Sequence, residues 1–206
     1  MQIKLTYQEP CTQALKLQPA QLRPIYAALI DRCLQFPFST VVTLESGEII
    51  ALLLNSIWRR DDVGGEGADY DTEGDNESEN LTKFIEMLNA CHEDFWKLAP
   101  PDVTAVLHRE ISSVSRKWQR QGIATKMVTA HLTKERIDEF GVGGVISETS
   151  SFANQALLLK QGFKCLKKIL YSSIVDSQGN QIVKTADGSQ ELRLNLKLIE
   201  HFNIAA

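Results

Sequence analysis

Residues 108–128 read HREISSVSRKWQRQGIATKMV, and this stretch decides the fold. We expect a strand to end near Val114, a polar and basic turn to follow, and an amphipathic helix to open at Gly122. The first N–H groups of a helix have no partner inside it and carry partial positive charge, so phosphate binds there readily. Gly122 lets a phosphate approach the backbone, and Arg116 and Arg120 add positive charge. The same pattern also opens ordinary helices, so the turn alone leaves both interpretations open.

Apolar residues recur at strand or helix spacing on both sides of this stretch. The spacing predicts strands at 3–7, 40–44, 49–58, 103–114, 143–148, 163–175 and 192–198, and helices at 18–34, 80–98, 122–140 and 151–161. The two runs at 40–44 and 49–58 are separated by Glu-Ser-Gly-Glu, which predicts a hairpin. This order predicts an α/β fold over residues 1–206, in a single domain with a mixed central sheet and helices on both faces.

The charge of the chain is unevenly distributed. The chain has 206 residues and a formal net charge of −4, yet residues 61–79 contain nine acidic residues and no Lys or Arg. Without those nine, the net charge is +5, which suits an anionic cofactor or an ordinary surface. The segment at 59–79 is too polar to bury apolar surface, so we expect an acidic flexible loop. A nucleic-acid partner is not expected, because the acidic loop repels phosphates.

The four cysteines, Cys11, Cys33, Cys91 and Cys165, lie far apart with no paired spacing. They match neither a zinc pattern nor a disulfide framework, so buried, reduced thiols and no metal site are expected. The chain has no apolar run near the ~18 residues that a membrane span needs, and no signal core at its start. These features predict a cytoplasmic protein without a membrane partner.

Two motifs resemble one known family. The segment at 119–124, QRQGIA, matches the Q/R-x-x-G-x-G/A signature of GNAT acetyltransferases, and it follows a strand and opens a helix as that signature requires. The segment at 151–163, SFANQALLLKQGF, resembles the later helix of that family, which ends in Gly-Phe. The order of elements from 40 to 198 fits as well. More narrowly, residues 110–114, EISSV, look like the strand of the arylalkylamine N-acetyltransferases.

The resemblance implies acetyl-CoA as co-substrate and a direct attack by the amine on its thioester in a ternary complex. A backbone N–H at Val114, or one residue to either side, is expected to hold the thioester carbonyl, as an oxyanion hole does. The pantetheine arm is expected where the strand at Ser112 parts from its parallel neighbour near Ser147. The residues expected to hold the cofactor are Ser112, Ser113, Val114, Gln119, Arg120, Gln121, Gly122, Ile123, Ala124 and Thr125.

Glu110 and His108 are the candidate catalytic residues. The resemblance places them where related enzymes have catalytic histidines, and residues two apart on a strand point to the same face. Glu110 is expected to act as general base, with His108 acting directly or through water. The alternatives are an exposed ion pair or a packed core histidine. The family often has a tyrosine acid at the position of Leu158, which has no proton to donate, so another group or water would supply it.

The substrate is expected to be a small primary amine of the arylalkylamine type. Phe36 and Phe38 could stack on an aromatic amine, and Ser147 is the other candidate contact. The alternative is that the two phenylalanines are core residues around Pro37. Two alternatives to this function remain open: an acetyltransferase acting on proteins or peptides, and a catalytically silent acyl-CoA-binding protein, which Leu158 favours. The sequence predicts either a monomer or a homodimer.

Overall fold

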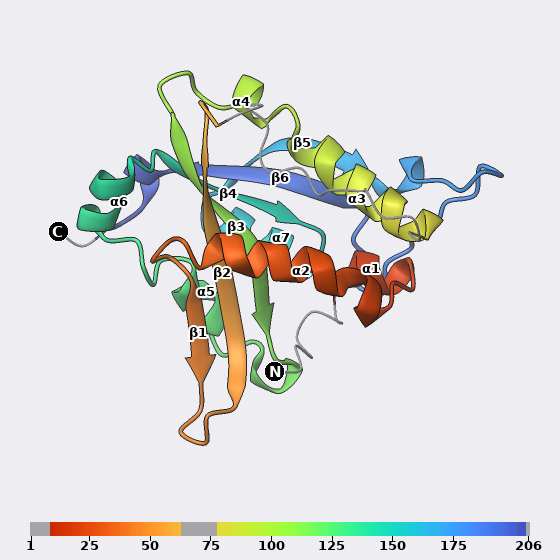
Figure 1. Ribbon diagram of the computed structural model, residues 1–206, viewed down its shortest axis with the longest axis horizontal. Helices are drawn as coiled ribbons and strands as arrows, with labels where there is room; N and C mark the ends of the chain where they lie inside the picture. Colours follow the sequence, from red (N-terminus) through yellow and green to blue (C-terminus); the bar gives the residue numbers. More distant parts are fainter. Residues whose placement is uncertain (1–8, 63–77, 205–206) are drawn as a thin grey trace.

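The fold is built on one six-stranded sheet with the strand order β1-β2-β3-β4-β6-β5 (Figure 1). The computed structural model describes residues 9–62 and 78–204, so the expected strand at 3–7 and residues 63–77 of the acidic loop lie outside it. The strands are β1 (Thr40–Thr43), β2 (Ile49–Arg59), β3 (Ala105–Val114), β4 (Gly144–Thr149), β5 (Lys164–Leu170) and β6 (Glu191–Leu198). Only β3 and β4 pair in parallel among these neighbours, so the sheet is mixed, as predicted.

Helices cover both faces of the sheet, which confirms the predicted architecture. They are α1 (Pro10–Ala14), α2 (Pro19–Cys33), α3 (Glu79–His92), α4 (Phe95–Leu98), α5 (Ile123–Met127), α6 (Lys134–Phe140) and α7 (Phe152–Lys160). On the face of α1 to α4, here called the front face, Trp58 and Val106 belong to one apolar core. On the face of α5 to α7, the back face, Ile57 and Leu107 belong to a second core. In Figure 1, α2 and α3 lie in front of the sheet and α7 lies behind it.

Two predicted helices are each divided in two. The helix expected at 80–98 is broken between α3 and α4, where the backbone of Asp94 leaves the helical region (φ −95°, ψ 7°). The helix expected at 122–140 ends at Met127, and α6 begins after Thr133. Thr133 Oγ1 accepts a hydrogen bond from Arg136 N, which caps the new helix. A capping threonine is a local start signal that the apolar periodicity of the longer segment conceals.

Two smaller predictions also need correction. The strand expected at 163–175 ends at Leu170, because the next residues form a 3₁₀ turn, Tyr171–Ser173. The Tyr171 ring is buried, and its hydroxyl donates to Ser150 O at 2.8 Å, which fixes this turn against the end of β4. Three cysteines are buried thiols as expected, but Cys165 is exposed. Within the described ranges, no helix has the length and apolar character needed to cross a membrane.

The two parallel strands part soon after they meet. β3 pairs with β4 only over Val106–His108, opposite Gly144–Ile146. Beyond that point β3 continues to Val114 along β2, while β4 continues to Thr149 along β6. Figure 1 shows the result, since β2 and β3 run down the view while β4 and β6 run across it. The sheet therefore contains a gap between the carboxyl ends of its two central strands.

A β-bulge lies at the start of this gap. Leu54 of β2 pairs with Ile111 and Asn55 pairs with Arg109, so Glu110 is an extra residue on β3. A bulge bends its strand and redirects the side chains on either side of it. Glu110 consequently points to the front face, where it contacts Ser56.

Arg60 holds the segment that leads into β3. Its Nε, Nη1 and Nη2 donate to the carbonyls of Val103 (3.1 Å), Trp96 (2.7 Å) and Pro100 (2.9 Å). Its guanidinium also lies over the Trp96 ring, 4.9 Å from the centroid. Hydrogen bonds from a charged donor are stronger than neutral ones, so this residue ties the α4–β3 connection to the end of β2.

We predict that Arg60→Met lowers the free energy of unfolding by about 2 to 4 kcal/mol, because three carbonyls lose a charged donor. Urea denaturation measures the change. Arg23→Met is the matched control, since Arg23 is exposed on α2 and its loss should cost less than ~0.5 kcal/mol. Equal stability of the two variants would show that the hydrogen bonds of Arg60 do not stabilise the fold.

Candidate active site

A cavity of about 530 Å³ occupies the gap between β3 and β4 and extends beneath α2 and α3. The part between the two helices, here called the apolar chamber, is lined by Leu22, Ile25, Leu29, Phe84, Met87 and Leu88. The other part follows β3 from Glu110 to Val114 and reaches Gln119, and Glu148 at the end of β4 also lines it. One continuous cavity thus joins an apolar chamber, two carboxylates and the basic turn after β3.

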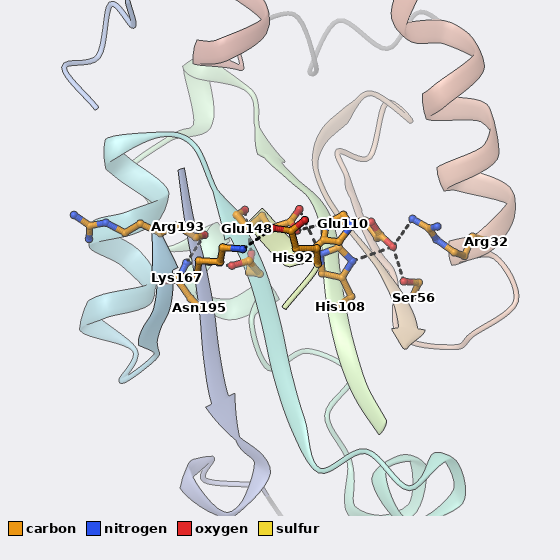
Figure 2. A network of polar contacts seen from close by, with 11 residues as sticks. Arg32, Ser56, His92, His108, Glu110, Glu148, Lys167, Arg193 and Asn195 are labelled. Carbon is orange, nitrogen blue, oxygen red and sulfur yellow. Dashed lines mark hydrogen bonds and ion pairs between the residues drawn. The ribbon is translucent and has the colours of Figure 1, made fainter. Parts of the chain in front are cut away.

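Glu110 is a buried carboxylate surrounded by donors, as Figure 2 shows. Its Oε1 accepts a hydrogen bond from Ser56 Oγ at 2.6 Å and lies 2.8 Å from Arg32 Nη2 and 3.1 Å from His108 Nδ1. Its Oε2 has no hydrogen-bond partner among residues 9–62 and 78–204. One oxygen is therefore fixed by α2, β2 and β3, and the other can receive a donor from the cavity that Glu110 lines.

The surroundings of Glu110 favour its charged form. Burial raises the pKa of the carboxyl, but His108, Arg32 and the Ser56 hydroxyl together outweigh burial and lower the pKa from 4.5 to about 2. Glu110 is consequently ionised at neutral pH and holds a proton weakly. The sequence predicts a general base at this position, and that role stays a prediction. A carboxylate with a low pKa also suits the binding of a cation.

Glu148 continues the charged network across the front face (Figure 2). Its Oε1 lies 2.7 Å from Nδ1 of His92, a buried residue near the end of α3. Its Oε2 lies 3.9 Å from His108 Nε2, so His108 stands between the two cavity carboxylates. The predicted pairing of His108 with Glu110 on one face is therefore observed, and Glu148 and His92 extend it.

Backbone N–H groups of β3 point into the gap. Ser115 N donates to Ile50 O of the β2 strand at 2.8 Å, and N–H directions alternate along a strand. The N–H groups of Ser112 and Val114 therefore point away from β2, toward the parted strand β4. Gln119 Nε2 donates to Val114 O at 3.0 Å, which agrees with this direction. The N–H of Ser115 is already bonded to β2, but those of Ser112 and Val114 can donate to a ligand between the strands.

The turn after β3 has the geometry of an anion site. Gly122 is left-handed (φ 79°), and a Cβ built on it meets nothing within 4 Å, so the backbone is open to a ligand. Arg120 is also left-handed (φ 61°). Among the described residues, no backbone acceptor takes the N–H of residues 120–122. Other residues predicted to hold the cofactor lie beside Arg120 and Gly122. Gln121 is exposed in the turn, and in α5 Ile123 and Ala124 are half-buried and Thr125 is exposed. These residues fit a pyrophosphate.

The comparisons with known proteins point to one fold. No protein-family model and no curated protein matches the sequence. Among solved structures, arylalkylamine N-acetyltransferase 2 from Aedes aegypti has a TM-score of 0.75 at 21% identity, covering 93% of this chain and 88% of its own. A polyamine N-acetyltransferase from Drosophila melanogaster, described as catalysing formation of N-acetylagmatine, has a TM-score of 0.72 at 15% identity, covering 96% and 91%. The chain has the GNAT fold.

An agmatine N-acetyltransferase mutant gives a similar result, with a TM-score of 0.70 at 16% identity over 95% of this chain and 89% of that chain. At such low identity these neighbours establish the GNAT fold alone. Within that fold, this chain has the parted strands, the bulge at Glu110 and the open turn at Gly122 described above.

The structure places the predicted substrate residues away from the cavity. Phe38 is buried in the back-face core and packs edge-on against Phe140 at 5.5 Å, and Phe36 meets the same ring at 6.0 Å. Ser147 is buried, and its carbonyl accepts a hydrogen bond from Asn195 on β6. None of the three lines the cavity described above. Leu158 is fully buried in the same core, so a proton donor at that position is absent from this chain.

Sequence reasoning missed four residues of this site, which are Arg32, Ser56, His92 and Glu148. Only the tertiary fold brings Arg32 and Ser56 to Glu110 on β3, and His92 to Glu148 on β4. Glu148 has a signal in the sequence, because it is a charged residue in a largely buried strand, next to the expected parting of the sheet. A carboxylate in such a place must be paired or must serve a ligand.

We predict that Glu110→Gln makes folding less stable at neutral pH and that this deficit disappears in acid. Because the pKa is lower in the folded state, the carboxylate contributes stability above pH 4.5 and loses it as the pH falls through about 2. The shift corresponds to roughly 3 kcal/mol. Urea denaturation at a series of pH values measures the difference between the two proteins.

The control is Glu86→Gln, because Glu86 is an exposed partner of Lys83 on α3. Its effect should stay near zero at every pH. A Glu110→Gln deficit that does not change between pH 5 and pH 2 would argue that Glu110 is not held ionised.

Proposed function

We propose that this protein is an acetyl-CoA-dependent N-acetyltransferase that transfers an acetyl group to a small primary amine by direct attack in a ternary complex. The observation that carries the proposal is the single cavity that joins the parted strands, the carboxylates of Glu110 and Glu148, and the apolar chamber. Solved structures of the same fold include enzymes named for arylalkylamines and for agmatine.

Acetyl-CoA fits the polar part of this cavity. The open backbone at Gly122 and the positive side chain of Arg116 suit its pyrophosphate. The inward N–H groups of Ser112 and Val114 suit its pantetheine arm and thioester carbonyl. When bound, it supplies an activated acetyl group, next to the carboxylates at the far end of the strand.

The apolar chamber supports an amine with an apolar body. An ammonium at Glu110 and Glu148 would direct the rest of the substrate between α2 and α3, against residues such as Phe84 and Leu29. A second cation, as in a diamine, would need another uncommitted carboxylate there. Glu9 and Asp187 also line the cavity, but Glu9 already accepts from two backbone N–H groups of α1 and Asp187 accepts from those of Phe152 and Ser189. The arylalkylamine class therefore fits better than a polyamine.

The environments of Glu110 and Glu148 suit them to different roles in the proposed reaction. Glu110 holds the ammonium through Oε2, because its low pKa makes it a stable anion and a weak base. Glu148 takes the proton, and His92 Nδ1, 2.7 Å from its Oε1, holds the carboxylate in place. The neutral amine can then attack the thioester carbonyl, while Ser112 N or Val114 N stabilises the oxyanion.

We predict thiol release from acetyl-CoA with arylalkylamines in preference to polyamines and lysine peptides. Glu148→Gln should lower kcat on the order of 100-fold, as loss of a general base does. Glu110→Gln should mainly raise KM for the amine, because it removes an anion that binds the ammonium.

Three outcomes would overturn parts of this account. Tight acetyl-CoA binding with no turnover on any amine favours the silent acyl-CoA binder that Leu158 suggests. Preference for peptides favours the protein acetyltransferase. A loss of kcat confined to Glu110→Gln returns the role of base to Glu110.

We predict that Gly122→Glu weakens acetyl-CoA binding at least tenfold, because a carboxylate at the turn repels the pyrophosphate. Gly47→Glu is a matched control. Gly47 has nearly the same backbone angle (φ 81°) and equally open space, but lies in the β1–β2 turn. Both variants carry the same backbone strain and charge, so calorimetric titration with acetyl-CoA isolates the position. Equal affinities for the two variants would rule out the turn as the pyrophosphate site.

A further inference from the structure

Arg109 is a buried arginine without a counter-charge. It is 3% exposed, and burial lowers the pKa of its guanidinium to about 10, so it stays charged at neutral pH. Its Nη2 donates to Ser112 Oγ at 3.3 Å, whereas Nε and Nη1 have no acceptor in the part of the chain that the structure describes. No ion pair to Arg109 occurs there either. A buried and unpaired charge is costly, so its presence calls for an anion nearby.

The position of Arg109 points to where that anion forms. Arg109 is the first residue of β3 beyond its last parallel pair with β4, so it stands where the gap begins. Its partner Ser112 lines the cavity. Ser112 Oγ accepts from the guanidinium, so its own proton is directed elsewhere, and no residue in the described ranges accepts it. The Ser112 hydroxyl is therefore a donor held at the cavity wall.

The thioester of acetyl-CoA must lie close to this hydroxyl. If the pyrophosphate occupies the turn at Gly122 and the amine nitrogen meets Glu110 and Glu148, the reacting carbon lies along β3 between them. Ser112 is within that interval, and its N–H points into the gap. This step rests on the function proposed above.

We propose that Ser112 Oγ–H donates a hydrogen bond to the departing sulphur of acetyl-CoA, and that Arg109 is a positioning residue that strengthens this donor. The amine nitrogen forms its bond to the acetyl carbon, the carbon–sulphur bond breaks, and the electron pair leaves on sulphur as a thiolate. Ser112 keeps its proton. Of the two protons that the ammonium loses, one is taken through solvent by the thiolate and the other is released by way of Glu148.

Other hydroxyls near the end of β4 are less suited to this role. Tyr171 Oη already donates to Ser150 O at 2.8 Å. Ser151 Oγ caps α7 by accepting from Asn154 N, a neutral backbone donor, whereas a guanidinium donates to Ser112 Oγ. Leu158 has no proton to give. A hydroxyl backed by a guanidinium gains donor strength in a buried site, because polarised hydrogen bonds reinforce one another.

The test compares two acetyl donors on wild type, Ser112→Ala and Ser112→Thr. With acetyl-CoA, Ser112→Ala should lower kcat about 10-fold to 100-fold, because the transition state loses a hydrogen bond to a charged group. The affinity for acetyl-CoA should be nearly unchanged. With S-phenyl thioacetate, Ser112→Ala should have nearly the same kcat/KM as wild type, because the phenylthiolate leaves readily without a hydrogen-bond donor. Ser112→Thr keeps the hydroxyl and should retain most activity. Ser115→Ala is the control, because Ser115 precedes the turn and its side chain caps nothing.

Arg109 is tested through the same readout. Once Arg109→Met has been checked for folding by thermal unfolding, adding Ser112→Ala to it should cause little further loss with acetyl-CoA, because the two residues act as one unit. Arg109→Lys, which keeps the charge, should fold in any case and lose less activity than Ser112→Ala.

The inference is wrong if Ser112→Ala lowers the rate equally with both donors, or behaves like Ser115→Ala. If the wild-type protein acetylates no amine, the proposed function itself is contradicted. The two failures are therefore distinguishable in one set of assays.

Discussion

The early parting of β3 from β4 is the constraint on which the rest of the site depends. The strands share only Val106–His108 opposite Gly144–Ile146, and each then follows its other neighbour. Backbone groups that would pair across a continuous sheet are left facing a gap, and buried backbone groups of that kind need partners. The bulge at Glu110 adds a bend at the same place. An extended ligand with amide groups, such as a pantetheine arm, can satisfy the exposed edge of β3.

Buried charges of both signs lie at the gap. They suit the proposed binding of an ammonium and the thiolate that forms when the proposed reaction proceeds. Glu110 and Glu148 lie on the front face with His108 between them, whereas Arg109 points to the back face. Alternation along β3, adjusted by the bulge, separates the negative groups from the positive one by the thickness of the sheet. In a buried site such charges interact strongly, so their separation would orient the proposed reaction across the gap. Arg32 completes the arrangement by keeping Glu110 ionised.

Much of the fold could be predicted from the sequence because its signals are local. The hairpin before Arg59, the strand to Val114 and the helix start at Gly122 each follow from residues within one short segment. Side-chain alternation also predicts that His108 and Glu110 share a face. Apolar spacing cannot distinguish a cavity wall from a core, so the sequence leaves Phe38 open to both roles, and the structure packs it on Phe140. Arg32 reaches Glu110 on β3, and His92 reaches Glu148 on β4, only through tertiary packing, which no local pattern records.

A crystal structure of the protein with CoA and an N-acetylated arylalkylamine tests the central claim most directly. The account predicts the CoA pyrophosphate at the N–H groups of residues 120–124 and the sulphur within hydrogen-bond reach, about 3.5 Å, of Ser112. The amide of the product should lie between Glu110 and Glu148, with its aromatic ring in the apolar chamber. CoA bound outside the gap between β3 and β4, or an amide remote from both carboxylates, would contradict it.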